Sequence, residues 1–239
     1  YLKLMHTTNL DLSLKEITKV EGTASLDLKI RDGLVTECKF GITEMKRFFT
    51  QAIRGKPIIA IPQLVARICG TCSNAHLLCS LKSIENGLGL SITTQTKLLR
   101  QLLNYGLIIR DHGLHLYVFV LPDLFNRNSI LDFDEKNPEE HTLLHDCFEV
   151  KEVGNKLGIT AGGRSVHAPF ATVGGFSKLP TIQNFTGLFP QLLAIRPRIL
   201  HLIEVFHNCG FELKQEVKFM ALVDPEFSFL DGEVITSDG

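Results

Sequence analysis

The most informative stretch of this sequence is Arg67-Ile68-Cys69-Gly70-Thr71-Cys72-Ser73-Asn74-Ala75-His76. A C-x-x-C pair places two thiols within reach of one metal ion, and the glycine lets the loop between them turn tightly. Thiolates are soft ligands that suit iron, nickel, copper(I) or zinc. His76 follows Cys72 by four residues, so a helix that starts here would place both on one face. Arg67 precedes the first cysteine by two residues and could offset thiolate charge.

An isolated C-x-x-C pair has three interpretations, and the residues alone leave all three open. A structural zinc site takes four ligands, usually from a second pair of cysteines or histidines, and no second C-x-x-C pair is present. A thioredoxin-like redox pair follows a strand in a βαβ unit, which the flanking residues do not indicate. The third interpretation is half of a multi-thiolate site. The isolated cysteines are expected to be small buried hydrophobic residues: Cys38, Cys79, Cys147 and Cys209.

Composition limits the class of protein. The chain has 239 residues, of which 44% are hydrophobic and 21% are charged, as in a globular protein. The net charge of −1 argues against a strong electrostatic nucleic-acid binder. No apolar run reaches the ~18 residues of a membrane helix, and no signal-peptide pattern opens the chain. The 6 cysteines are too sparse for a secreted disulfide scaffold, so we expect a cytoplasmic protein.

Hydrophobic periodicity predicts a small β part before the motif and a long helix after it. Alternation in residues 16–40 predicts a β-hairpin that turns at Asp32-Gly33. Residues 44–54 predict a helix that ends at Gly55. After the motif, helices are predicted over about 74–86 and over 94–120, the second with one apolar face and an end at Pro122.

The second half of the chain is predicted to be helical around a glycine-rich loop. Residues 126–142 are polar and acidic and predict a surface loop. Helices are predicted over 143–159 and 189–208. Between them, the glycines of 162–176 rule out a regular element and would let the backbone approach another group closely. Together these patterns predict an α+β fold that is mainly α.

Several motifs in order give the chain a family resemblance. R-I-C-G-x-C-x-x-x-H resembles the first cysteine signature of the nickel–iron hydrogenase large subunit. Similar segments follow the family order: Val20-Glu21-Gly22, Arg47-Phe48-Phe49 with Gly55-Lys56, Asp111 to Tyr117 with Leu121-Pro122-Asp123, and Gly162 to His167 with Val173 to Phe176. The match is most similar to the cytoplasmic branch that reduces pyridine nucleotides, also called sulfhydrogenases. It implies the family's large-subunit fold, with an N-terminal β-hairpin and a core of long helices.

The resemblance also implies a metal centre and roles for residues around it. In the family, four thiolates hold nickel and two of them bridge to an iron that carries carbon monoxide and cyanide. Cys69 and Cys72 match the N-terminal thiolate pair, and His76 matches the histidine that hydrogen-bonds near the bridging sulfur. Arg67 matches the arginine of the motif. Glu21 matches the glutamate that relays the proton released when dihydrogen is split.

Further residues match the surroundings of that centre. Asp111 matches an aspartate of the polar canopy over the metals, although a solvated charge on a helix is an equal interpretation. His167 resembles the histidine near the proximal iron–sulfur cluster of the small subunit, which would make the glycine-rich loop a subunit interface. His112 and His115 are expected to be buried packing residues. The implied partners are a small subunit with iron–sulfur clusters and a diaphorase-type or other electron-accepting module.

Some features depart from the family pattern. Thr50 stands where the family usually has a glutamate that helps to hold a magnesium-type ion, so this ion is not predicted. The second cysteine signature, D-P-C-x-x-C, is absent, and Asp224-Pro225-Glu226 does not supply it. We therefore expect residues 1–239 to be a single domain that is incomplete at the C-terminus. Its parts would be the hairpin at 16–40, the metal-motif loop and core helices at 58–122, and the helices with the interface loop at 143–210.

Three functions are compatible with this pattern. The first is part of a hydrogenase catalytic subunit that cleaves dihydrogen reversibly and needs the missing C-terminal half with the second cysteine pair. The second is the quinone-side subunit of respiratory complex I, a relative on the same fold that has lost its metal-binding cysteines. Cys69 and Cys72 argue against that subunit. The third is a non-catalytic truncated homologue that keeps only the interface.

Overall fold

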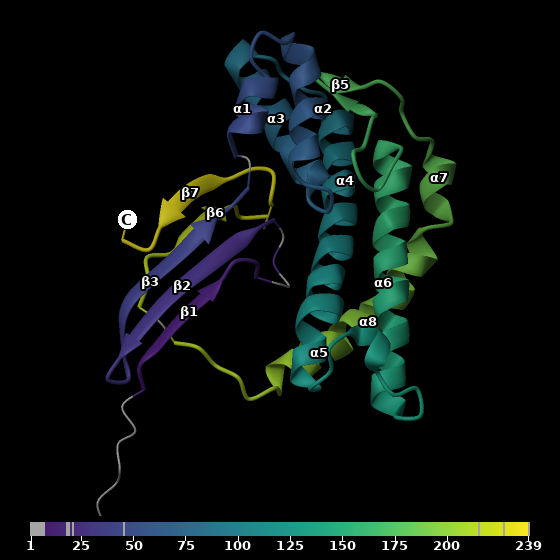
Figure 1. Cartoon of the computed structure of the whole chain (residues 1–239). Coiled ribbons are helices and arrows are strands. Elements are labelled where there is room, and N and C mark those ends of the chain that lie inside the picture. The colour runs from purple at the N-terminus through teal and green to yellow at the C-terminus, as the bar shows by residue number, and fades with distance from the viewer. Residues whose placement is uncertain are drawn as a thin grey trace, which may run out of the picture. The chain divides into compact units, whose positions relative to one another are not determined.

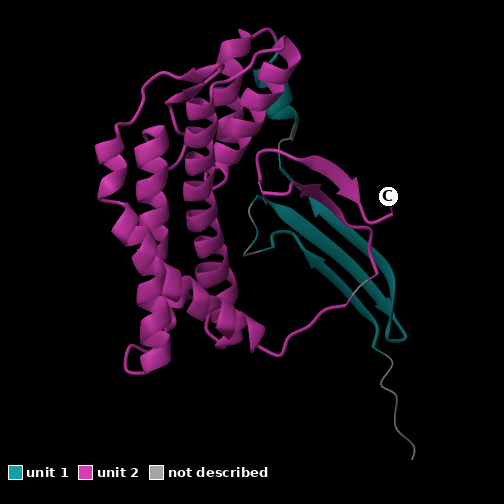
Figure 2. Ribbon diagram, turned by 180° about the vertical axis from the view of Figure 1, so that it is seen from behind, with its two compact units in different colours: residues 1–54 teal, residues 55–239 magenta. Residues whose placement is uncertain are grey.

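The computed structural model describes residues 8–17, 20, 22–44, 46–214, 216–226 and 228–238. The chain divides into two compact units, residues 1–54 and residues 55–239, which Figure 2 shows in different colours. The described residues of the first unit form a small sheet and one short helix, and those of the second unit are mainly helical.

The first unit is a three-stranded antiparallel sheet in the order β1-β2-β3, with strands Leu10–Leu14, Ala24–Arg31 and Leu34–Ile42. Asp32 and Gly33 at the β2–β3 turn have φ values of 52° and 77°, as a tight hairpin turn requires. The short helix α1, Lys46–Ala52, follows β3. The predicted hairpin is confirmed for β2 and β3, but β1 was not predicted although its leucines alternate with polar residues.

The second unit contains the helices that carry the motif (Figure 1). Its helical elements are η1 (Ile58–Ala60), α2 (Ile61–Val65), η2 (Ala66–Ile68), α3 (Ser73–Leu88), α4 (Thr94–Gly113), η3 (Leu114–Val120), α5 (Leu121–Leu124), η4 (Ile130–Asp132), α6 (Pro138–Gly162), α7 (Ile182–Thr186) and α8 (Phe189–His207). The strands described in this unit form two antiparallel pairs, β4 (Ala171–Thr172) with β5 (Gly175–Phe176) and β6 (Met220–Val223) with β7 (Glu233–Thr236). The expectation that 162–176 contains no regular element is wrong, because β4 and β5 lie within it.

Helices α4 and α6 lie side by side along much of their length (Figure 1). Glycines make this close approach possible, because a Cβ atom on Gly106 would lie 2.6 Å from the backbone nitrogen of Gly158. A Cβ atom on Gly154 would likewise lie 2.7 Å from the backbone nitrogen of Arg110. The two backbones therefore touch, and any side chain at these positions would push the helices apart.

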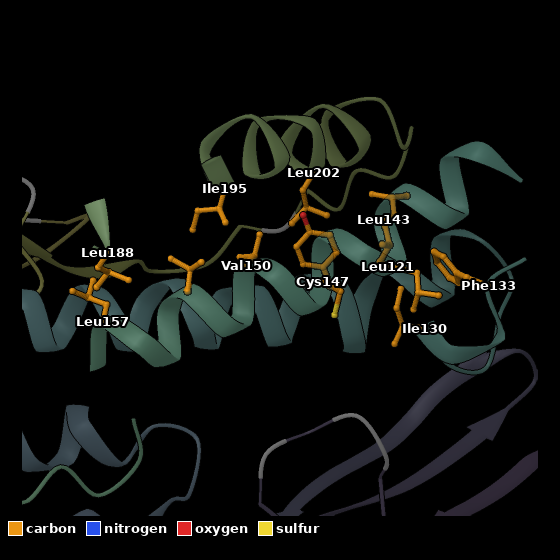
Figure 3. Close-up of a cluster of buried hydrophobic side chains, with 13 residues drawn as sticks. Leu121, Ile130, Phe133, Leu143, Cys147, Val150, Leu157, Leu188, Ile195 and Leu202 are labelled. Atoms are coloured by element: carbon orange, nitrogen blue, oxygen red, sulfur yellow. The ribbon is translucent and has the colours of Figure 1, made fainter. Parts of the chain in front are cut away.

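Two hydrophobic clusters fill the described part of the second unit. The larger one lies among η3, α5, α6 and α8 (Figure 3), and its buried residues are Tyr117, Leu121, Ile130, Phe133, Leu143, Leu144, Cys147, Val150, Val153, Leu157, Leu188, Ile195 and Leu202. The smaller one packs α3 against α4 and the glycine-rich loop, and its buried residues are Ala66, Leu77, Leu78, Leu81, Leu103, Ala161, Ala168 and Ala171. The smaller cluster therefore includes residues on both sides of the C-x-x-C motif in the sequence, Ala66 before it and Leu77 after it.

The long helix predicted over 94–120 changes its winding and does not end at Pro122. It is α-helical to Gly113, continues as the π-helix η3 and runs on through α5 to Leu124. The wide turn precedes Pro122, which lacks the backbone N–H that an α-helical ladder needs. Tyr117 within η3 is completely buried and its hydroxyl lies 3.4 Å from the carbonyl oxygen of Arg198.

The segment predicted as a surface loop over 126–142 contributes to the core. Ile130 and Phe133 are only 4% and 5% exposed, and they anchor η4 to the larger cluster. Helix α6 also begins before the predicted residue 143, because the side chain of Asn137 caps it by accepting from the N–H groups of Glu139 and Glu140. It ends where Gly163 adopts a left-handed φ of 86°.

The expectation that all isolated cysteines are buried is wrong. Only Cys147 is buried, whereas the other three, Cys38, Cys79 and Cys209, are exposed. Cysteine is small and moderately apolar, so its type alone does not determine which face of an element it occupies. Among the described residues, no helix is long and apolar enough to cross a membrane.

Candidate metal centre

The C-x-x-C motif forms a tight loop between η2 and α3. Cys72 is the N-cap residue of α3, and its backbone N–H donates to the Sγ atom of Cys69 at 3.1 Å. The hydroxyl of Thr71 lies 3.5 Å from the same sulfur. Cys69 and Cys72 are joined by a disulfide, with their Cα atoms 5.5 Å apart, and both are half-buried.

The donor set of this loop fits half of a four-thiolate centre. Once the disulfide is reduced, Cys69 and Cys72 are close enough to bind the same ion, and both are soft ligands for nickel or iron. The N-terminus of α3 and the N–H group of Cys72 favour negative charge at the sulfurs. No other described cysteine belongs to this loop, so a four-thiolate centre would need two further thiolates from elsewhere.

The position of His76 agrees with the spacing argument, whereas the role of Arg67 beside the thiolates stays a prediction. The backbone N–H of His76 donates to the carbonyl oxygen of Cys72 at 3.4 Å, so the two residues are one helical turn apart. Arg67 is exposed at the end of η2 and lies near His167. Partial burial lowers the pKa of His167, and the positive charge of Arg67 lowers it further, whereas a hydrogen bond with the Ala66 backbone opposes the shift.

The two residues that follow Cys72 attach the glycine-rich loop to the start of α3. Ser73 and Asn74 are completely buried. The hydroxyl oxygen of Ser73 accepts from the backbone N–H of His167 at 2.9 Å. The Asn74 side chain donates to the carbonyl of Ser165 at 2.8 Å and accepts from the N–H of Ala168 at 3.2 Å. Ser73 and Asn74 therefore position His167 and its neighbours beside the start of α3.

Arg110 on α4 joins the same two loops and was not predicted as a site residue. It is only 5% exposed, and its guanidinium donates to the carbonyls of Thr71 and Ser165. A signal for it was available, because Arg110 lies four residues after Gly106 and seven after Leu103, on the buried face of α4. An arginine on an apolar helix face indicates buried acceptors that need a donor.

A buried ion pair holds the far end of the glycine-rich loop. Arg100 donates to both carboxylate oxygens of Glu85 at 2.6 Å and to the carbonyl of Thr172 at 3.0 Å. The backbone N–H of Gly174 donates to Glu85 at 2.7 Å. Burial raises the pKa of Glu85, but the hydrogen bonds from Arg100 and Gly174 and the charge of Arg100 outweigh burial and hold the pKa below its ordinary value.

The remaining predicted residues fall into three groups. Asp111 follows Arg110 on α4 and is half-buried, and its role in a canopy over the metals stays a prediction. His112 and His115 are exposed, so the expectation that they are buried is wrong. His112 lies in the last turn of α4 and His115 in η3, and the three-residue spacing alone did not determine whether these positions are buried. Glu21 lies outside the described residues.

Sequence comparisons identify relatives of this chain. The sequence profile of the family described as nickel-dependent hydrogenase matches residues 47–158. Sulfhydrogenase 2 subunit alpha of Pyrococcus furiosus is 34% identical over 170 residues, which cover 71% of this chain and 40% of that protein. Sulfhydrogenase 1 subunit alpha of the same organism is 31% identical over 202 residues, covering 84% of this chain and 46% of that protein.

Structure comparisons identify the same fold. An NAD+-reducing NiFe-hydrogenase in the H2-reduced state matches 95% of this chain and 54% of its own, with a TM-score of 0.85 and 20% identity. The Ni-Fe-Se hydrogenase of D. vulgaris Hildenborough in the reduced state matches 85% of this chain and 45% of its own, with a TM-score of 0.72 and 20% identity.

The chain therefore has the fold of nickel–iron hydrogenase large subunits, mainly helical with a small β part, as the sequence predicted. It belongs to the nickel-dependent hydrogenase family, and its curated relatives are named hydrogenases. It spans 40% and 46% of the length of the two sulfhydrogenase subunits it matches.

Proposed function

We propose that this chain supplies the N-terminal thiolate pair of the catalytic subunit of a cytoplasmic nickel–iron hydrogenase, which splits dihydrogen reversibly into protons and electrons. The observation that carries the proposal is the loop from Cys69 to Cys72 at the start of α3, with two adjacent sulfurs and a backbone N–H directed at one of them. The membership of the chain in the nickel-dependent hydrogenase family supports this interpretation over a structural zinc site.

The cysteines must be reduced before they can hold a metal. Two equivalents of a thiol reductant would cleave the Cys69–Cys72 disulfide by exchange, giving two protein thiols and the disulfide of the reductant, and metal binding would then release the thiol protons. A second cysteine pair from the rest of the subunit would complete the four thiolates. When bound, the nickel–iron centre with carbon monoxide and cyanide on its iron supplies the site where dihydrogen is split heterolytically.

The other residues of the chain would control charge and protons around the thiolates. His76, one turn after Cys72, would donate a hydrogen bond near that sulfur, and Arg67 would offset negative charge. Glu21 would accept the proton released by the heterolytic cleavage, since a carboxylate suits a relay. Asp111 would add a polar group over the metals. Arg110 would fix the loop by holding the carbonyl of Thr71.

The electrons would leave through a partner protein. We propose that the glycine-rich loop with His167 contacts a small subunit that carries iron–sulfur clusters. A diaphorase-type or other electron-accepting module would then receive the electrons. The attachment of this loop to Ser73 and Asn74 supports the proposal, because it couples the partner's docking surface to the helix that begins at Cys72.

Metal analysis of the intact complex tests the function. We expect about one nickel for each large subunit in the wild type and loss of nickel in Cys69→Ser and Cys72→Ser. Cys209→Ser is the matched control, because Cys209 is an exposed cysteine outside the loop. Zinc without nickel in the wild type, or an unchanged nickel content in Cys72→Ser, would contradict the proposal.

The second candidate function is that of a non-catalytic homologue which keeps the subunit interface. It is favoured by one observation, namely that the C-x-x-C loop supplies only two of four thiolates. This candidate predicts an intact complex with the small subunit and no nickel. A complex I-type subunit is less well supported, because such subunits have lost the cysteines that this chain carries at 69 and 72.

A further inference from the structure

We propose that Glu135, His141 and His145 form a binding site for a divalent transition-metal ion at the start of α6. One ligand atom from each of these side chains lies within 4.8 Å of those of the other two. Among the residues that the structure describes, no other three side chains of histidine, cysteine, aspartate or glutamate form such a group. The site shares no residue with the Cys69–Cys72 loop.

The two histidines lie on one face of the helix. His141 and His145 are one turn apart, the spacing by which helices present two imidazoles to one ion. Their ring centroids are 4.4 Å apart, and the carboxylate of Glu135 is 3.9 Å from Nδ1 of His141. A tetrahedral ion with bonds of about 2.1 Å holds its ligands roughly 3.4 Å apart. All three side chains are exposed, so small rotations can reach this spacing.

The loop that carries Glu135 is fixed on both sides of this residue. The carboxylate of Glu140, only 6% exposed, accepts from the backbone N–H of Asp134 at 2.9 Å and from Arg127 at 3.0 and 3.1 Å. The side chain of Asp134 in turn accepts from the N–H of Lys136 at 2.9 Å. Glu140 and Arg127 are therefore positioning residues that hold Glu135 beside the start of α6.

The chemistry of the three ligands defines the ions that fit. Imidazole suits zinc, copper and nickel, and two histidines with one carboxylate are an established zinc ligand set. Such a set leaves one position for water, and solvent reaches this site because its three residues are exposed. We therefore expect Zn²⁺ to bind here, and Ni²⁺ and Cu²⁺ to compete with it.

Equilibrium dialysis of the full chain against Zn²⁺ alone tests the site, with bound zinc measured by mass spectrometry under non-reducing conditions. We expect the wild type to bind one zinc ion more than His141→Ala/His145→Ala. His201→Ala/His207→Ala is the matched control and should bind as much as the wild type. Loss of a residue that only hydrogen-bonds to a metal ligand already costs about 10–100-fold in metal affinity. Glu135 would be a ligand itself, so Glu135→Gln should lower the zinc affinity at least about tenfold.

Two results would overturn the site. The first is equal zinc binding by the wild type and the double histidine variant. The second is unchanged affinity in Glu135→Gln, because two histidines alone would then explain the binding. Arg127→Ala should weaken zinc without removing a ligand, and circular dichroism would show whether α6 stays folded. Nickel content of the intact complex is measured in the same variants, and it should not change if the two sites are independent.

Discussion

The guanidinium of Arg110 donates a hydrogen bond of 2.5 Å to the backbone carbonyl of Ser165, 55 residues further along the chain. The same guanidinium donates to the carbonyl of Thr71 inside the C-x-x-C loop. One buried side chain on α4 therefore fixes the distance between the candidate metal loop and the glycine-rich loop. Both carbonyls are held by a charged donor, which makes stronger hydrogen bonds than a neutral one.

Arg110→Met should destabilise the chain by about 1.5–3 kcal/mol, the usual contribution of hydrogen bonds to a charged group. Urea unfolding measures this free energy, and hydrogen exchange should show faster opening of the loop around Ser165. Arg110→Lys should fall between the wild type and Arg110→Met, because an ammonium cannot reproduce the fork of a guanidinium. The exposed Arg196 provides the control, and Arg196→Met should stay within about 0.5 kcal/mol.

The contact between α4 and α6 makes a second prediction. Gly154→Ala would place a methyl group 2.7 Å from the backbone nitrogen of Arg110, so the helices must separate. We expect a loss of about 1–3 kcal/mol in the free energy of unfolding. Gly187→Ala is the control, since a Cβ atom there meets nothing within 4 Å. If both variants unfold at the same urea concentration as the wild type, the backbones are not in the close contact described.

Periodicity predicted the helices whose caps and apolar faces are local in the sequence. The apolar periodicity of residues 94–120 predicted α4. Gly89 caps the C-terminus of α3 with a φ of 65°, close to the predicted end of that helix. The hairpin from β2 to β3 followed from alternation and the Asp32-Gly33 turn. These features depend on neighbours within a few residues, which a single sequence displays directly.

Contacts between distant segments could not be predicted in the same way. The sequence contains Arg110 and Ser165, but nothing in it states that they meet, because that pairing depends on the approach of α4 to α6 through glycine. The π-helical winding of η3 could not be predicted either, because a hydrophobic period of about 3.6 residues indicates an α-helix and not the wider turn of a π-helix. The family resemblance identified Cys69, Cys72 and His167, whereas the residues that join their loops came only from the fold.

The buried pair of Glu85 and Arg100 predicts a pH dependence of stability. The pKa of Glu85 is lowered in the folded chain, so its contribution is complete above the unfolded pKa of about 4.3 and is lost as pH falls through the folded value. Thermal unfolding between pH 3 and pH 7 measures this loss. Glu85→Gln should flatten the acid limb of the curve.

The same pair predicts a large cost at neutral pH. Glu85→Ala leaves Arg100 buried without its carboxylate, which should cost about 3–5 kcal/mol. Glu152→Ala breaks the exposed pair of Glu152 with Lys156 and should cost no more than about 0.5 kcal/mol. If the two substitutions lower the free energy of unfolding equally, burial does not make the loss of the Glu85–Arg100 pair more costly than the loss of an exposed pair.

The relay role proposed for Glu21 predicts a specific catalytic defect. Glu21→Gln removes the carboxylate but keeps the shape of the side chain, so the intact complex should keep its nickel and iron. Its exchange of dihydrogen with the deuterons of heavy water should fall strongly, by a factor of about 10²–10⁴ if the relay acts as a general base. The exposed Glu16 offers a control in Glu16→Gln, which should exchange normally. Normal exchange in Glu21→Gln would refute the relay.

The disulfide between Cys69 and Cys72 predicts that metal uptake depends on the redox state of the chain. Thiolates bind metal and disulfides do not, so Co²⁺ added to the reduced chain should produce a thiolate-to-metal charge-transfer band, and the oxidised chain should lack it. The band should disappear in Cys72→Ser and persist in Cys79→Ser, since Cys79 is exposed on α3 outside the loop. Histidine and carboxylate ligands at Glu135, His141 and His145 give no such band, so this measurement reports on thiolate ligands and not on that site. A band of equal strength in the oxidised chain would show that other thiols bind the ion.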